Sequence, residues 1–434
     1  MTGQELGDAL VQRGLDEGER AAIADVFDRV LSASPRDGAW SHAWWTPGRL
    51  EVFGTHTDYA GCRTLVCAVP RGIAMVGRPR RDDRVIVTDV ATGQSVDLSV
   101  SQPTAFDGWR RYVAVVVARL ARNFDGALRG SEVAFQSTLP RASGMSSSSA
   151  LVVATASALA DLNDLSTHPR WIANIQSRVD VAGYFACIEN GRSFGDLAGD
   201  AGVGTHGGSE DHAAILTGRP STVTAFRFAP MARLADVAVS EEWRFVIAPS
   251  NVRAEKTGGA QASYNRLARE VQTLLDLWNA HEPPVGSLAD ALETAPTASV
   301  RLQDLVERST LPAASIESLT RRLAHVVRED AMVQPALESF RTGNSEALGN
   351  LSAESQAIAE SLLRNQVPET VQLAHAARRL GAFAARSFGA GFGGSVWALV
   401  DADAAPAFAA RWHADAFVMR PGPPHALLSQ QFRR

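Results

Sequence analysis

The chain has 434 residues, of which 45% are hydrophobic and 21% are charged, and this composition is typical of a globular protein with a sizeable core. Its formal net charge of -5 argues against nucleic acid or an anionic membrane as the main partner. The sequence has no apolar run of membrane-spanning length, its polar N-terminus is unlike a signal peptide, and its 3 cysteines lack metal-type spacing. We therefore expect a cytoplasmic protein of two or three domains, or of two large lobes.

Helical and β patterns alternate along the first half of the chain. Residues 1–36 predict helices, and a β pattern over 44–76 is interrupted by a polar turn at 54–61. The later elements of this half are hairpin strands at 84–90 and 95–100, a helix at 112–124, and a strand at 131–135 that leads into a serine-rich loop.

The second half is mainly helical. A glycine-rich stretch at 191–208 predicts a loop, and a buried strand is expected at 243–248. An amphipathic helix at 264–278 opens a helical region that extends to about residue 380, followed by a strand at 396–400 and a final β segment near Phe417. We divide the chain into an N-terminal lobe, 1–225, and a C-terminal lobe, 226–434.

The serine-rich loop is the strongest single signal. From Pro140 to Ala150 the chain reads Pro-Arg-Ala-Ser-Gly-Met-Ser-Ser-Ser-Ser-Ala, and an alanine-rich helix follows. The unpaired N–H groups of a helix N-terminus bind anions, and hydroxyls there add donors for phosphate. Simple capping of the helix would need one serine. The sequence has no Walker loop, so we expect nucleotide phosphates to bind here in a different architecture, on Ser143, Gly144, Ser146, Ser147, Ser148 and Ser149.

Two further motifs flank this loop in the sequence. In the first, residues 47–61, a strand breaks into a turn bearing Thr55, His56 and Asp58, which can converge on a small polar ligand or merely bond the backbone of a hairpin turn. The second, residues 389–395, reads Gly-Ala-Gly-Phe-Gly-Gly-Ser, which by itself is most simply a tight turn before a buried strand.

In this order and spacing, the three motifs resemble those of the GHMP superfamily of sugar and metabolite kinases. The pattern Pro-Gly-Arg-x-x-x-x-Gly-x-His-Thr-Asp-Tyr-x-Gly is similar to the sugar-binding signature of the galactokinase branch, and the resemblance runs from about residue 44 to the C-terminal strands. It implies a two-lobed α+β fold, with a mixed-sheet N-terminal lobe that carries the sugar motif and phosphate loop, and a ferredoxin-like C-terminal lobe. ATP and substrate would meet between the lobes.

The resemblance also implies roles for individual residues. Asp211 matches the catalytic aspartate of a Gly-x-x-Asp segment that starts at Gly208, and we favour it over the neighbouring Glu210 because of its offset from the glycines. Arg49 matches the arginine that holds this aspartate and stabilises the transferring phosphoryl group; the alternative is an arginine paired with a surface carboxylate.

The same resemblance suggests a magnesium site and a sugar site. Ser148, or Ser147 with an error of one residue, and Glu189 match the Mg²⁺ ligands, although Glu189 could instead be a solvated residue at a helix end. For the sugar, the matching or adjacent residues are Thr55, His56, Asp58, Gly208 and Tyr264, of which Tyr264 could equally be a core aromatic.

We therefore expect ATP- and Mg²⁺-dependent phosphorylation of a galactose-like monosaccharide at its anomeric hydroxyl, by a monomer or small homo-oligomer. Thr55 stands where galactokinases have a glutamate that binds the 6-hydroxyl, so galactose, galacturonate and L-arabinose are the candidate acceptors, and we expect galactose not to be the best of them. The alternatives are another small-molecule kinase of the superfamily and a catalytically silent sugar sensor.

Overall fold

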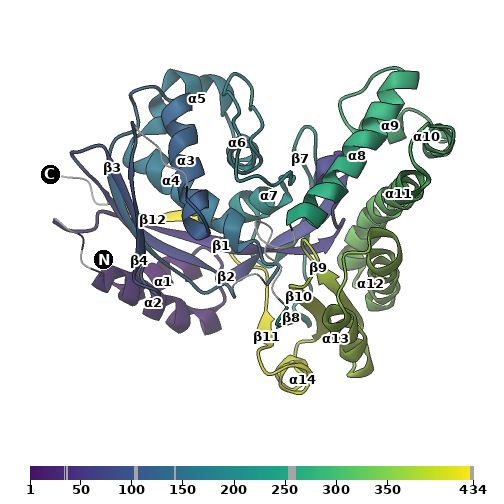
Figure 1. The fold of residues 1–434 in the computed structure, drawn as a ribbon. Coiled ribbons are helices and arrows are strands. Elements are labelled where there is room, and N and C mark those ends of the chain that lie inside the picture. Colours follow the sequence, from purple (N-terminus) through teal and green to yellow (C-terminus); the bar gives the residue numbers. More distant parts are fainter. Residues whose placement is uncertain (34, 36–37, 102–105, 141–142, 253–260, 431–434) are drawn as a thin grey trace.

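The computed structural model describes residues 1–33, 35, 38–101, 106–140, 143–252 and 261–430, and it has two sheets, each covered by helices (Figure 1). The larger sheet has eight strands in the order β12-β1-β2-β5-β3-β4, with β6 paired to β2 and β7 to β6. Its strands are β1 (His42–Phe53), β2 (Arg63–Pro79), β3 (Arg84–Asp89), β4 (Gln94–Ser99), β5 (Ser131–Ser137), β6 (Thr222–Arg227), β7 (Ala232–Ala238) and β12 (Ala426–Gln430). Only the β3–β5 pairing is parallel among the pairings of this described sheet, so the sheet is mixed.

Helices cover both faces of this sheet, and the central strand β1 shows why. All of its residues are buried, and neighbouring side chains of a strand point to opposite faces. Trp44 packs into the core under α3 and α4, whereas Trp45 packs into a second core under α1 and α2 (Figure 1). The helices of this lobe are α1 (Gly3–Val11), α2 (Glu17–Ser32), α3 (Trp109–Asn123), α4 (Ser147–Leu162), α5 (Pro169–Asn174), α6 (Arg178–Asn190) and α7 (Glu210–Thr217), with short 3-10 turns η1 (Asp58–Ala60) and η2 (Leu165–Thr167).

The second sheet has four antiparallel strands in the order β11-β8-β10-β9, and it forms the α+β layer of the other lobe. Along β10 the side chains alternate: Trp397 and Leu399 join the core on the side of α11 and α12, and Ala398 joins a core with α13 and α14. The elements are β8 (Trp243–Pro249), β9 (Ala384–Phe388), β10 (Ser395–Asp401), β11 (Phe417–Met419), α8 (Gln261–His281), α9 (Leu288–Glu293), α10 (Ala298–Glu307), α11 (Ala313–Thr342), α12 (Ser345–Ile358), the π-helical turn η3 (Ala359–Leu363), α13 (Pro368–Arg379) and α14 (Ala405–Trp412).

Most of the expected elements are present, including the helix at 112–124 (within α3), the loop between α6 and α7, and the helix at 264–278 (within α8). The predicted lobe boundary differs from the division between the sheets. Residue 225 lies inside β6, because the β6–β7 ribbon continues the first sheet through its pairing with β2, and β12 returns to the same sheet beside β1. Within the described ranges, no helix has both the length and the apolar character needed to cross a membrane.

Candidate active site

A cavity at the junction of the two lobes is lined by all the predicted motifs. The strand β1 and the turn after it contribute Arg49, His56 and Asp58, and the start of α7 contributes Asp211. The other contributors are α4 with Ser149, α6 with Glu189, the loop before α7 with Gly208, α8 with Tyr264, and the glycine motif after β9 with Gly389. Segments that are far apart in the sequence therefore surround one small polar space.

Arg49 and Asp211 form the centre of this cavity. Both side chains are almost completely buried, and Nε of Arg49 donates to Oδ1 of Asp211 over 2.7 Å, with a second bond from Nη2. Nη1 donates to the carbonyl oxygen of Gly144 over 3.2 Å. Burial lowers the pKa of the Arg49 guanidinium, but the charges of Asp211, Glu210 and Glu51 raise it by more, so the group stays cationic.

The second oxygen of Asp211 contacts the serine-rich loop. Oγ of Ser149 donates to Oδ2 of Asp211 over 3.0 Å. The aspartate is thus held from two sides, by the guanidinium of β1 and by a hydroxyl on the first turns of α4. This arrangement fixes the carboxylate where the phosphate loop, the strand motif and the Gly-x-x-Asp segment meet.

The serine-rich loop packs directly against the last glycine motif. Gly144 and Ser146 have positive φ values of 78° and 59°, and α4 begins at Ser147. A Cβ on Gly389 would lie 2.8 Å from the carbonyl oxygen of Gly144, and Oγ of Ser395 donates to the carbonyl oxygen of Ser143 over 2.6 Å. The glycines of both motifs therefore permit a close contact between two backbones. Residues 141–142 of the predicted loop lie outside the described residues.

The serines of this loop have different surroundings. The hydroxyl of Ser146 is buried and has no hydrogen-bond partner among the described residues, and Ser143 donates to the carbonyl of Pro140. Ser147 and Ser148 are partly exposed at the N-terminus of α4, as a phosphate-binding role requires.

Asp58 organises the start of α7. Its Oδ2 accepts a hydrogen bond from the backbone N–H of Glu210 over 3.1 Å, and its Oδ1 accepts one from the backbone N–H of Tyr59. A Cβ on Gly208 would lie only 2.0 Å from Oδ2 of Asp58. Glycine at position 208 therefore allows the loop to pass close to this carboxylate.

Replacing Gly208 with alanine should lower the unfolding free energy by about 1–3 kcal/mol, the usual cost of such overpacking, and should raise the KM for the sugar because the displaced group is Asp58. Steady-state kinetics and the thermal midpoint would measure the effect. Gly286→Ala is the matched control, since the nearest atom to its added Cβ lies at 3.7 Å. An unchanged KM in Gly208→Ala would show that Asp58 does not depend on this close approach.

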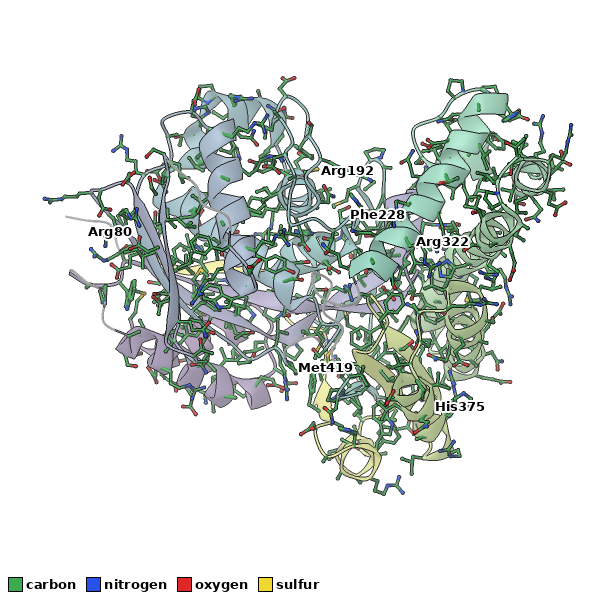
Figure 2. The ribbon with its side chains drawn as sticks, viewed as in Figure 1. Arg80, Arg192, Phe228, Arg322, His375 and Met419 are labelled. Carbon is green, nitrogen blue, oxygen red and sulfur yellow. The ribbon has the colours of Figure 1, made fainter. Side chains whose placement is uncertain are left out.

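His56 is held by neighbours from both lobes. Its Nε2 lies 3.0 Å from the carbonyl oxygen of Ala390, which can only accept, so Nε2 carries the proton and Nδ1 accepts from the hydroxyl of Tyr59. Arg322 of α11, labelled in Figure 2, donates to that hydroxyl over 2.7 Å and to the carbonyl oxygen of His56 over 2.8 Å. Burial raises the pKa of Tyr59, so its hydroxyl keeps the proton that it donates.

Thr55 is a predicted sugar-binding residue that the cavity lining does not include. Its hydroxyl donates to the carboxylate of Glu51 and accepts from the guanidinium of Arg386, and its side chain is not part of the cavity lining. Both partners of the hydroxyl are buried charged groups. Glu51 lines the cavity instead, so a carboxylate is present four residues before the position where galactokinases have theirs.

The sequence analysis did not identify Glu51 as a site residue, although the strand pattern around Arg49 indicates it. It is two residues after Arg49 in a strand, and a period of two places both side chains on the same face. Glu210, named only as the alternative to Asp211, also belongs to the site, because its Oε1 lies 2.9 Å from Nη2 of Arg49. Burial raises the pKa of the Glu210 carboxyl well above its ordinary value, and the charge of Glu51 adds to this effect.

Glu189 lies beside His212 at the edge of the cavity. The distance between Oε2 of Glu189 and Nε2 of His212 is 3.3 Å, and neither atom has a hydrogen-bond partner within the described part of the chain. That part also has no group of three or more His, Cys, Asp or Glu side chains placed to hold a metal ion. A single available carboxylate fits Mg²⁺, because this ion usually keeps several waters and takes its other ligands from one or two protein carboxylates and from the substrate phosphates.

Segments of both lobes match models of known protein families. The model of the GHMP kinases N terminal domain matches residues 111–191, that of the GHMP kinases C terminal domain matches 336–418, and the galactokinase galactose-binding signature matches 34–79. The chain is 27% identical to a galactokinase of Streptomyces coelicolor over 392 residues, which cover 89% of this chain and 90% of that protein. It is 26% identical to a galactokinase of Glaesserella parasuis, covering 82% and 84% of the two chains.

Solved structures show the same likeness in fold. Lactococcus lactis galactokinase in complex with galactose has a TM-score of 0.74 at 23% identity, covering 94% of this chain and 99% of its own. Methanococcus jannaschii mevalonate kinase has a TM-score of 0.54 at 14% identity, covering 89% and 99%. The similarity therefore includes both lobes, and the signature covers the strand motif that carries Arg49 and Asp58.

Proposed function

We propose that this chain, which belongs to the GHMP kinase superfamily and carries the galactokinase signature, is an ATP-dependent sugar kinase that phosphorylates a galactose-like monosaccharide at its anomeric hydroxyl. The observation that carries the proposal is the buried Arg49–Asp211–Ser149 cluster. It joins the sugar motif, the catalytic segment and the phosphate loop at one point of the cavity.

In the proposed reaction, the oxygen of the sugar hydroxyl forms a bond to the γ-phosphorus of ATP, and the bond from that phosphorus to the β–γ bridging oxygen breaks. The hydroxyl proton passes to the Asp211 carboxylate, and the products are a sugar 1-phosphate and ADP. Arg49 holds Asp211 in place and stabilises the negative charge on the transferring group.

The N-terminus of α4 would bind the phosphates of ATP through its free N–H groups and the serine hydroxyls. Glu189 and Ser148 are the residues that would hold Mg²⁺, which neutralises charge on the phosphates when it is bound. Asp58, His56 and Tyr264 line the side of the cavity where the sugar would bind.

The charges of the cavity bear on the three candidate acceptors. Thr55 in place of a glutamate removes one carboxylate, which by itself would favour galacturonate, but Glu51 lines the cavity and supplies another. A sugar carboxylate would therefore meet like charge, and galactose or L-arabinose fits better than galacturonate.

The alternatives are a silent sugar sensor and a kinase for another small molecule of the superfamily. A sensor has no need of the buried Arg49–Asp211 pair, and the galactokinase signature favours a sugar over mevalonate. ADP release measured with MgATP and a sugar panel separates these functions, because a sensor binds a sugar without turnover and another kinase releases ADP only with its own acceptor.

Replacing Ser148 with alanine should raise the Mg²⁺ concentration that gives the half-maximal rate several-fold and leave the sugar KM nearly unchanged, since the proposed role of this hydroxyl is toward metal and phosphate. Ser147→Ala is the matched control from the same helical turn. An effect confined to the sugar KM would contradict the assignment, and an effect confined to Ser147→Ala would move it by one residue.

A further inference from the structure

The turn that carries His56 and Asp58 has an unfavourable backbone conformation. His56 has a positive φ of 57°, in the left-handed region that residues other than glycine rarely adopt. Both residues line the cavity, on the side where the proposed sugar would bind. A residue in this region keeps its conformation only where the surrounding structure determines it, so the turn needs support from contacts outside its own sequence.

One face of α11 provides that support. Arg322, His325 and Glu329 follow each other at intervals of three and four residues, which places their side chains on the same side of the helix, and all three are buried. Neither Arg322 nor Glu329 is among the described residues that line the cavity. An effect of these two side chains on substrate binding therefore acts through the residues that they hold.

Glu329 binds the start of the turn. Its Oε2 accepts hydrogen bonds from the backbone N–H groups of Gly54 and Thr55, each over 3.3 Å. Its Oε1 accepts one from the hydroxyl of Ser355 on α12, and Nη1 of Arg386 lies 3.7 Å from Oε2. The carboxylate therefore satisfies two buried backbone donors at the point where β1 ends.

Arg322 binds the rest of the turn. It donates to the carbonyl oxygen of His56 over 2.8 Å and to the hydroxyl of Tyr59 over 2.7 Å. Its other acceptors are the carbonyl oxygen of Leu267 and Nδ1 of His325. Burial lowers the pKa of His325 well below its ordinary value, and the charge of Arg322 adds to this effect, so the ring stays neutral. The identified acceptors of this buried cation are therefore all neutral, and four of them share the work of satisfying its donors.

We propose that Arg322 and Glu329 are positioning residues, which hold the turn of residues 54–59 in the conformation in which His56 and Asp58 bind the sugar. This inference rests on the proposed sugar-kinase function. Each charge matches the backbone groups that it meets, because the carboxylate accepts from N–H groups and the guanidinium donates to a carbonyl. The turn is thereby preorganised before the sugar binds.

This support should act on sugar binding more than on phosphoryl transfer. Asp211 is held by Arg49 and Ser149, which belong to β1 and α4 and not to the turn. If a weakened turn adopts its binding conformation only part of the time, the apparent affinity for the sugar falls in proportion to that fraction. The rate at saturating sugar and the affinity for ATP should then change little.

Arg322→Met tests the assignment, because methionine keeps an apolar stem and removes all the donors. The KM for D-galactose in the ADP-release assay should rise at least about tenfold, which is the effect of losing one charge-assisted hydrogen bond. The values of kcat and of the KM for ATP should stay nearly unchanged. If the wild-type protein turns over L-arabinose and not D-galactose, L-arabinose is the acceptor in this assay. Hydrogen–deuterium exchange of a peptide that contains residues 54–59 should become faster.

Three further variants complete the test. Arg322→Lys keeps the charge and some of the donors, so its KM for the sugar should lie between those of the wild-type protein and Arg322→Met. Glu329→Gln keeps an oxygen for the two N–H groups but removes the charge, so it should also raise this KM, and it tests the proposal even if Arg322→Met does not fold. Arg328→Met is the matched control on α11, because Arg328 is half-exposed and pairs with Glu354, and both of its KM values should equal those of the wild-type protein.

The outcomes separate this inference from the function on which it rests. A sugar KM that is unchanged in the folded variants of Arg322 and Glu329 would overturn the inference and leave the sugar-kinase function intact. A fall in apparent kcat with both KM values unchanged would also overturn it, because a smaller folded fraction has that effect and a displaced turn does not. If no sugar stimulates ADP release by the wild-type protein, the proposed function fails and the positioning role fails with it.

Discussion

Replacing Asp211 with asparagine is expected to lower kcat about 10²–10⁴-fold and to leave ATP binding nearly unchanged, because the proposed role of the carboxylate is toward the sugar hydroxyl and not toward the nucleotide. Asparagine keeps an oxygen that can accept from Arg49, so the buried contact between β1 and α7 is largely retained. Sugar-dependent ADP release would give kcat, and titration with a non-hydrolysable ATP analogue would give the nucleotide affinity.

Ser149→Ala provides the comparison for this variant. It removes one neutral hydrogen bond to Asp211 and keeps the carboxylate, so its loss of kcat should be much smaller than that of Asp211→Asn. Near-normal turnover by a folded Asp211→Asn protein would exclude Asp211 as the proton acceptor, and the neighbouring Glu210 would become the candidate.

Replacing Arg49 with leucine should have the largest effect on stability, about 3–5 kcal/mol of unfolding free energy, and should also abolish measurable turnover. The substitution leaves the buried carboxylates of Asp211 and Glu210 without their shared cation, and breaking a buried ion pair from one side has a cost of this size. Urea unfolding followed by tryptophan fluorescence would measure the change.

An exposed ion pair provides the reference for this change in unfolding free energy. Arg328 pairs with Glu354 over 2.7 Å, with about half of each side chain in solvent. Arg328→Leu should therefore cost less than about 1 kcal/mol. If Arg49→Leu costs no more than Arg328→Leu, the Arg49 cluster does not bear on stability as the structure implies.

The parts of the site that sequence reasoning predicted are those marked by short local motifs. Arg49, Asp58, Gly208 and Asp211 each belong to a motif with its own spacing, and all four line the same cavity. The expected helix after the serine-rich loop is present, although it begins at Ser147, four residues earlier than the predicted alanine-rich stretch, directly after the positive φ at Ser146. Such features depend on a few adjacent residues and can be recognised without the rest of the chain.

Other features depend on contacts between distant segments. The hydroxyl of Thr55 accepts a hydrogen bond from Arg386, which lies 331 residues later, and no local pattern indicates that partner. For the same reason, the pairing of β12 with β1 and of the β6–β7 ribbon with β2 was not expected, and the predicted boundary near residue 225 does not follow the two sheets. Glu51 is a different case, since its alternation with Arg49 along β1 could have identified it.

The most direct test of the proposed function is ADP release by the wild-type protein with MgATP, measured with and without each sugar of galactose configuration. A sugar kinase built on the Arg49–Asp211 centre should release ADP slowly without sugar and much faster with its acceptor, with one sugar phosphate formed for each ADP. Sugar binding detected by calorimetry, without any increase in ADP release for any sugar of the panel, would contradict this account.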